Sequence, residues 1–210
     1  MKKECPFCAE LQDKTLNPLR KHRIVCETEH FVVFPTVGCL VVNYLLVVPK
    51  KHHTCIGHLS DAEYRDLNIV LKKIHNNNNV VLRSSTIMYE HGSAVENPNA
   101  GNSVFHAHLH VLPLNDTLKD DAVNDNVEIS QINSICELSS TIKKAPSYLY
   151  YSDTDGSSYE ILHSGVESQY FRRLLSKRIG RPDMWNWREY PFFNNMEKTL
   201  DMHRKYALCS

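Results

Sequence analysis

The stretch Phe105-His106-Ala107-His108-Leu109-His110-Val111-Leu112-Pro113 determines how the rest of this sequence is interpreted. Side chains of a β-strand alternate between two faces, so His106, His108 and His110 fall on one face and the apolar residues fall on the other. Neighbours on one face stand about 6.5–7 Å apart, close enough for three imidazoles to flank one phosphorus or metal centre. A solvent-facing strand that is merely rich in histidine is the alternative. The strict alternation and the closing proline favour a strand with one packing face and one chemical face.

Length and composition limit the classes of protein to which the chain can belong. Its 210 residues are enough for one sizeable core. Lysine plus arginine equals aspartate plus glutamate at 24 each, so no overall basic field attracts nucleic acid or anionic membrane. No stretch approaches the roughly 20 apolar residues of a membrane span, and the first residues lack a signal-peptide core. The sequence therefore predicts a cytoplasmic protein.

The cysteine pattern predicts a metal site. An odd number of cysteines, 7, without a secretory signal argues against a disulfide framework and predicts reduced thiols or metal ligands. The segment Cys5-Pro6-Phe7-Cys8 can bring two thiolates to one metal ion from a single turn. A redox pair and incidental thiols are the alternatives, but a redox motif normally follows a strand that this short N-terminus cannot supply. Structural zinc takes four ligands, and spacing alone does not decide whether His52, His53 or the triad completes the set.

The histidine pattern, preceded by Ala100-Gly101-Asn102-Ser103-Val104, resembles the histidine triad (HIT) superfamily of nucleotide hydrolases and transferases. The resemblance covers Cys5 to Pro113. It implies an α+β fold with an antiparallel sheet of about five strands and packed helices, a nucleotide substrate and a homodimer. We expect a catalytic domain over residues 1–114 and a small C-terminal α/β extension over residues 115–210, packed on the same unit.

The resemblance also implies a role for each histidine of the triad. By resemblance to zinc-bearing HIT proteins, His52 and His106 of this chain would complete a structural zinc site with the two cysteines. Such a site has no open position for water. His108 would attack an α-phosphate and form a nucleotidyl-histidine intermediate, and His110 would orient or protonate near the phosphate. Histidine suits these tasks because its unperturbed pKa is about 6.5.

The loop before the triad is a candidate phosphate site. Glycine permits close approach, and a nest of backbone amides favours anions. Taken without the triad, the segment would be an ordinary turn. Beside the triad, and with Ser or Thr at this place in family members, the predicted phosphate contacts are Gly101, Asn102 and Ser103.

Periodicity predicts the elements around these motifs. Strands are expected at residues 23–27, 31–34, 40–48 and 86–90. A helix is expected from Leu59 to Ile74, with Ser60 and Glu63 as its capping box, and the asparagine run 76–79 is interpreted as a solvated turn that ends it. Many family members carry Gly-His where this chain has Asn43-Tyr44, so the role that the family gives to these two positions does not carry over directly.

In the C-terminal half we expect a linker at residues 115–126, a helix at 129–142, a hairpin through Asp155-Gly156, and helices at 169–179 and 195–206. Arg172 and Arg173 belong to a basic patch near Trp185 and Trp187. Arginine forks bind phosphate and indoles stack on bases, so a polyphosphate or second nucleotide could bind there. A solvated helix face with two core tryptophans is the alternative.

The leading functional hypothesis is hydrolysis of a dinucleoside polyphosphate, or of a nucleoside phosphoramidate or ester. One alternative is a nucleotidyltransferase or phosphorylase, because zinc-bearing relatives of the galactose-1-phosphate uridylyltransferase branch share the Cys-x-x-Cys arrangement. The other is a sensor that binds a nucleotide without turning it over.

Overall fold

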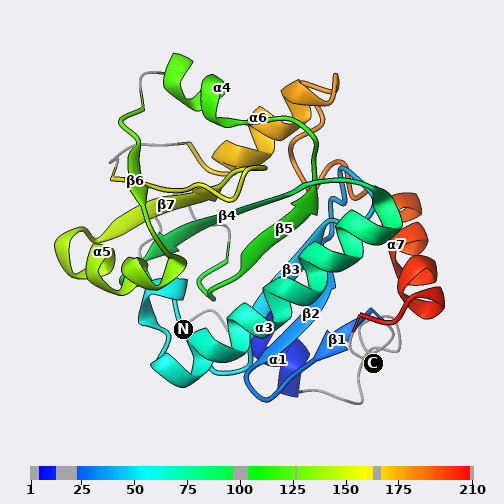
Figure 1. The fold of residues 1–210 in the computed structure, drawn as a ribbon, viewed down its shortest axis with the longest axis horizontal. Helices are drawn as coiled ribbons and strands as arrows, with labels where there is room; N and C mark the ends of the chain where they lie inside the picture. The colour runs from blue at the N-terminus through cyan, green and yellow to red at the C-terminus, as the bar shows by residue number, and fades with distance from the viewer. Residues whose placement is uncertain (1–4, 13–22, 97–103, 126, 163–166, 209–210) are drawn as a thin grey trace.

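The computed structural model describes residues 5–12, 23–96, 104–125, 127–162 and 167–208. Within these ranges, eight strands form one sheet in the order β1-β2-β3-β5-β4-β7-β8-β6, with every neighbouring pair antiparallel (Figure 1). The strands are β1 (Cys26–Glu27), β2 (Phe31–Pro35), β3 (Leu45–Pro49), β4 (Thr86–Ser93), β5 (Leu109–Pro113), β6 (Ser130–Ile132), β7 (Ser147–Ser152) and β8 (Ser158–Ile161). The helices are α1 (Pro6–Gln12), α3 (Asp61–Asn77), α4 (Lys119–Asn124), α5 (Leu138–Lys144), α6 (Tyr170–Arg178) and α7 (Phe193–Lys205). This arrangement confirms the predicted α+β fold class.

The sheet is larger than predicted because the C-terminal residues continue it. Strands β1 to β5 are the five expected strands, and β7 pairs with β4 from Met88↔Ser152 to Ser93↔Ser147. The predicted hairpin forms from β7 and β8, and β6 follows at the edge. A turn signal identifies a hairpin but not the strand against which it pairs. The domain boundary at residue 114 stays a prediction.

Helix α3 begins as the sequence predicts. The Ser60 hydroxyl accepts from the Glu63 backbone N–H, and the Glu63 side chain accepts from the Ser60 backbone N–H. The two bonds satisfy N–H groups that a helix start otherwise leaves without partners. The apolar face of the helix is buried through Leu67, Val70 and Ile74. It crosses one face of the sheet (Figure 1).

The asparagine run differs from the prediction. Helix α3 extends to Asn77, and a π-helical turn follows over Asn78–Leu82. Asn78 is fully buried, accepts from the Asn43 side-chain amide at 2.5 Å and donates to the Thr86 hydroxyl at 2.9 Å. The solvated-turn interpretation is therefore wrong at this residue, because a polar side chain is buried when the fold supplies its partners.

Two further elements differ from the prediction. The strand expected at residues 40–48 begins only at Leu45, because Asn43 adopts φ 64°, outside the strand region. The helix expected at 129–142 forms only from Leu138, because Ser130–Ile132 pairs with β8 as an edge strand. In the second case tertiary pairing overrides the local periodicity. The predicted linker at 115–126 also contains α4.

The two faces of the sheet carry different layers. Leu109 and Val111 of β5 belong to the cluster that packs under α3. Leu112 belongs to a second cluster with Tyr44 and Tyr89, on the opposite face. Because neighbouring residues of a strand face opposite ways, His110 lies on this second face, away from α3.

Cys26 is disulfide-bonded, so reduced thiols or metal ligands do not account for every cysteine. Cysteine count alone cannot show which thiols a fold brings together.

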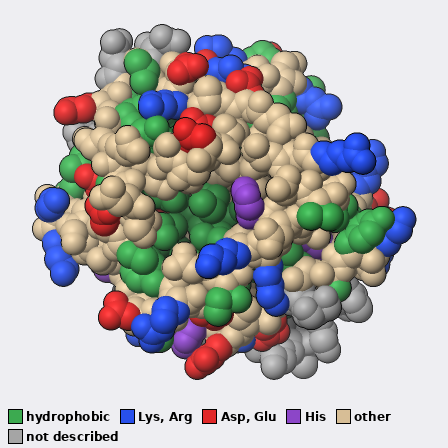
Figure 2. All heavy atoms as spheres, in the orientation of Figure 1, with side chains coloured by type: hydrophobic (Ala, Val, Ile, Leu, Met, Phe, Trp, Pro, Cys, Tyr) green, Lys and Arg blue, Asp and Glu red, His purple; other side chains and the backbone are tan. Residues whose placement is uncertain are grey.

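Among the described helices, none is long and apolar enough to cross a bilayer. Acidic and basic side chains are interspersed over the face seen in Figure 2, and hydrophobic side chains gather in a hollow near its middle.

Candidate metal centre and active site

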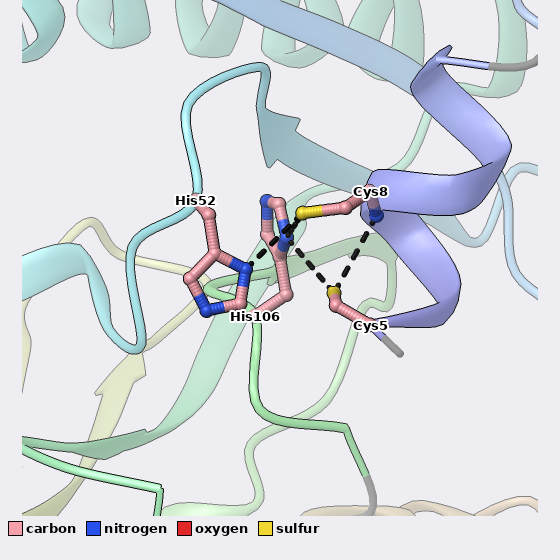
Figure 3. A group of neighbouring side chains, drawn as sticks. All are labelled: Cys5, Cys8, His52 and His106. Carbon is pink, nitrogen blue, oxygen red and sulfur yellow. Dashed lines mark hydrogen bonds between the residues drawn. The ribbon is translucent and has the colours of Figure 1, made fainter. Parts of the chain in front are cut away.

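Four side chains from three segments converge at one point. Cys5 and Cys8 come from the start of α1, His52 from the loop after β3, and His106 from the segment before β5. Figure 3 shows the two sulfur atoms and the two imidazoles turned toward one another. One candidate ligand atom from each residue lies within 4.8 Å of all the others. The four predicted metal ligands are therefore brought together, and this group could hold a metal ion.

The separations within this cluster suit a tetrahedral ion. Cys8 Sγ lies 3.2 Å from His52 Nδ1, and His106 Nδ1 lies 3.4 Å from Cys5 Sγ and 3.5 Å from Cys8 Sγ. A zinc ion with ligands at about 2.0–2.3 Å places tetrahedral neighbours about 3.5 Å apart. The donor atoms thus fit zinc, and three of their separations match a tetrahedral ion, while all four atoms lie within 4.8 Å of one another.

A hydrogen bond fixes the ring atom that His106 offers. His106 Nε2 lies 2.8 Å from the Pro49 carbonyl, which can only accept, so Nε2 carries the hydrogen and the Nδ1 lone pair faces the cysteines. Burial lowers the pKa of His106 to about 4, which keeps the ring neutral. His52 turns Nε2 toward a carboxylate oxygen of Glu96 at 3.6 Å. A carboxylate behind a ligating histidine is a frequent feature of metal sites.

The structure also separates His52 from His53. His53 is buried, and its Nε2 lies 2.8 Å from Glu63 Oε1. Its backbone carbonyl accepts the Ala107 N–H at 2.7 Å. His53 is thus engaged with α3 and with the triad segment, while its neighbour faces the cysteines.

The triad is not one continuous strand. Strand β5 begins at Leu109, so His106 and His108 precede it and only His110 is a strand residue. The backbone N–H of Ala107 donates to the loop carbonyl of His53 and not to a neighbouring strand. The strand pairing of β5 therefore starts at Leu109 and does not include His108. The imidazoles still gather, since the ring centroids of His108 and His110 are 5.0 Å apart.

His108 is held in one tautomer. Its Nδ1 lies 2.7 Å from the His106 carbonyl oxygen, so Nδ1–H donates and the lone pair lies on Nε2. Burial lowers the pKa of His108 below its ordinary value, which favours the neutral ring. Phe7 of α1 packs edge-on against this ring, with centroids 5.5 Å apart.

His110 lies against two tyrosines that no sequence motif assigned to the site. Tyr89 is its cross-strand partner, and the two rings stack with centroids 4.6 Å apart. The Tyr44 hydroxyl lies 3.0 Å from His110 Nδ1 and also contacts the Tyr89 hydroxyl. Burial, and then the charges of His108 and Arg172, hold the pKa of His110 well below its ordinary value. The departure of Asn43-Tyr44 from the family pattern could have pointed to Tyr44 in the sequence. Tyr89 could be found only from the register in which β4 pairs with β5.

The predicted phosphate contacts stay predictions. Gly101, Asn102 and Ser103 lie outside the described residues. Arg172 is buried and donates to the carbonyls of Trp185 at 3.0 Å and Gly38 at 2.9 Å, while its Nη1 has no partner among the described residues.

Arg173 is already engaged by its neighbours. It stacks over Trp185 at 3.4 Å from the ring centroid and lies 3.2 Å from a Glu167 carboxylate oxygen. Its assignment to phosphate remains a prediction.

A separate hollow of about 310 Å³ lies beside α3, and no histidine lines it. It is lined by Leu59, Asp61, Tyr64, Arg65, Asn68, Cys136 and Ser139. Tyr64 and Leu59 belong to the cluster under α3, on the face opposite His110. This hollow is therefore not the candidate active site.

Comparison with known proteins identifies the family. Residues 18–117 match the family model of the HIT domain. The chain is 30% identical over 122 residues to an uncharacterized HIT-like protein of Mycoplasma genitalium, which covers 58% of this chain and 81% of that protein. It is 35% identical over 96 residues to the nitrilase and fragile histidine triad fusion protein NitFhit of Caenorhabditis elegans, which covers 43% of this chain and 20% of that protein.

Among solved structures, a HIT family protein from Bacillus anthracis is 21% identical with a TM-score of 0.43, covering 69% of this chain and 98% of that chain. The domain match and the Mycoplasma relative define the class as a histidine triad protein. This chain belongs to the HIT family, whose members are generally nucleotide-binding hydrolases or transferases.

Proposed function

We propose that this protein is a nucleotide hydrolase that cleaves at an α-phosphate through a covalent nucleotidyl intermediate on His108. The observation that carries the proposal is the hydrogen bond from His108 Nδ1–H to the His106 carbonyl at 2.7 Å, which leaves the lone pair on Nε2. A neutral imidazole is a competent nucleophile near neutral pH. The proposed substrates are dinucleoside polyphosphates and nucleoside phosphoramidates or esters.

The reaction would have two steps. First, the His108 Nε2 lone pair forms a bond to the α-phosphorus, and the bond from phosphorus to the leaving group breaks with its electron pair. Water then attacks the same phosphorus, the P–N bond breaks, and its electron pair returns to Nε2. Water supplies one oxygen and one proton to the nucleotide, and its second proton goes to the leaving group or to solvent. His110 would donate a hydrogen bond to a phosphate oxygen, where charge redistributes.

The metal cluster supports the nucleophile indirectly. Cys5, Cys8, His52 and His106 would hold a structural zinc ion, which when bound supplies a four-coordinate cross-link with no open position for water. The contribution of His106 to the reaction is its backbone carbonyl, which receives the His108 hydrogen bond. Fixing this carbonyl fixes the orientation of the nucleophile.

The remaining site and partner assignments are also proposals. Gly101, Asn102 and Ser103 would supply phosphate contacts from the loop, and Arg172 and Arg173 would supply positive charge. We propose a cytoplasmic location and a nucleotide as the partner. A homodimer is proposed from the family resemblance. Its interface would not use the edge of β4 opposite β5, because β7 already pairs with β4 there.

The test is turnover and intermediate trapping with His108→Asn. Wild-type protein is incubated with a diadenosine polyphosphate and with an adenosine phosphoramidate, and the products are identified with and without inorganic phosphate or a sugar phosphate. We expect a nucleoside monophosphate from water, a nucleotidyl adduct on His108 in quenched wild-type protein, and loss of both in His108→Asn. The control is His75→Asn, an exposed residue of α3.

Each other outcome has a defined meaning. Unchanged turnover by His108→Asn overturns the mechanism. Product that forms only with added phosphate or sugar phosphate identifies a phosphorylase or transferase. Tight binding without turnover of any nucleotide identifies a sensor.

A further inference from the structure

Two tyrosine hydroxyls lie behind the third histidine of the triad. The Tyr44 hydroxyl is 3.0 Å from His110 Nδ1 and contacts the Tyr89 hydroxyl. Tyr44 is 0% and Tyr89 3% exposed, so water does not complete their hydrogen bonds. In such surroundings a hydroxyl hydrogen without an acceptor is costly, and the direction of each bond can be worked out by accounting for every donor.

Only one direction uses every hydrogen of this group. If His110 Nδ1–H donated to Tyr44, then Tyr44 would donate to Tyr89, and the Tyr89 hydrogen would have no acceptor among the described residues. If Tyr89 donates to Tyr44 and Tyr44 donates to Nδ1, each hydroxyl hydrogen has an acceptor. The second direction leaves the ring hydrogen of a neutral His110 on Nε2.

We infer that Tyr44 and Tyr89 are positioning residues that hold His110 as its Nε2–H tautomer, ready to donate a hydrogen bond to an oxygen of the bound phosphate. The catalytic meaning of this inference rests on the proposed function, whereas the tautomer itself does not. His108 and His110 then present the same ring atom of a neutral imidazole to one phosphate in opposite protonation states, a bare Nε2 from His108 and an Nε2–H from His110. Different hydrogen-bond partners thus give two identical side chains different tasks.

Arg172 reinforces the neutral state of this group. Its guanidinium carbon lies 5.6 Å from the centre of the Tyr44 ring, and the side chain is 4% exposed. A buried cation disfavours a second proton on His110, because two positive charges repel strongly where water is excluded. The same cation makes the neighbouring phenol a better hydrogen-bond donor.

The C-terminal extension holds Tyr44 in place. The backbone N–H of Asn43 donates to the Thr199 hydroxyl at 2.8 Å, and His203 Nε2–H donates to the Asn43 side-chain oxygen at 2.7 Å. Both partners belong to α7, and Arg172 belongs to α6. The extension therefore completes the surroundings of a triad histidine.

The direct test is nitrogen NMR of histidine-labelled protein, with the His110 signals assigned by their loss in His110→Asn. At neutral pH we expect Nε2 of wild-type His110 to be protonated and Nδ1 to have the shift of a bare nitrogen. In Tyr44→Phe we expect a mixture of tautomers. The matched control is Tyr150→Phe, a buried tyrosine whose hydroxyl bonds to Ser158 at 3.2 Å on the other face of the sheet.

Kinetics provide the second readout. With a substrate that wild type hydrolyses, Tyr44→Phe should lower kcat about fivefold, the size expected for one neutral hydrogen bond, with KM unchanged. Tyr44→His returns a donor and should recover part of the loss. A wild-type His110 protonated on Nδ1, or a tautomer unaffected by Tyr44→Phe, overturns the inference. The predicted tautomer in a protein without turnover would instead overturn only the proposed function.

Discussion

His53 Nε2 lies 2.8 Å from Glu63 Oε1, joining the loop that carries His52 to the first turn of α3. Glu63 also accepts the Ser60 backbone N–H at 2.7 Å. Burial opposes a charge on Glu63, but the hydrogen bonds from Ser60 and His53 outweigh it and lower its pKa to about 2. One carboxylate thus completes a helix cap and anchors the loop that presents a candidate metal ligand.

Replacing this carboxylate should destabilise the fold. Glu63→Ala removes the reciprocal half of the capping box and leaves His53 buried without its partner, so we expect a loss of about 1–3 kcal/mol in the free energy of unfolding. The measurement is urea unfolding followed by circular dichroism. Glu29→Ala is the control, because its side chain is 83% exposed, and it should change stability little. Equal effects of the two substitutions would contradict this role.

The same residue predicts a pH dependence. The pKa of Glu63 is lowered from 4.5 to about 2 in the folded protein, so its stabilisation is complete above about pH 4.5 and is lost as the pH falls toward 2. The difference in unfolding free energy between wild type and Glu63→Gln should therefore shrink over that range. A difference that stays constant down to pH 2 would show that the charge of Glu63 does not contribute.

Metal content separates the two adjacent histidines. We expect wild-type protein to retain zinc through gel filtration, and Cys8→Ser and His52→Ala to lose it, because each removes one of four ligands. His53→Asn should keep its zinc, since that side chain faces Glu63. Zinc is quantified by mass spectrometry of the purified proteins. Retention by His52→Ala together with loss from His53→Asn would reverse the assignment.

Residue patterns alone predicted features that depend on neighbouring residues, whereas several features that depend on the pairing of distant segments were missed. The Ser60–Glu63 capping box forms as expected because both residues lie in one turn of chain. The cysteine pair and His106 meet as the family resemblance implied. The stacking of Tyr89 on His110 was missed because it follows from the pairing of β4 with β5, and a single sequence does not state that register.

The strict alternation of the triad also holds only in part. The rule that side chains alternate is a property of strands, and here it places His110 correctly beside Tyr89 on the face opposite α3. His108 takes its orientation instead from a bond to the His106 carbonyl, a local turn of chain that hydrophobic periodicity does not encode. The burial of Asn78 was missed for a similar reason, because its partner Asn43 comes from a distant turn.

Gly38 offers a test of how closely the extension packs against the loop before Tyr44. A Cβ at Gly38 would lie 2.5 Å from the Trp187 Cβ and 2.6 Å from Arg172 Nη2, and its φ of +78° already disfavours other residues. Gly156 has a similar φ of +84° but nothing within 4 Å of an added Cβ. We expect Gly156→Ala to cost about 1 kcal/mol from backbone strain alone, and Gly38→Ala to cost about 1–3 kcal/mol more from overpacking. Urea unfolding of both variants gives the difference, and equal losses would show that Trp187 and Arg172 yield freely to the added methyl group.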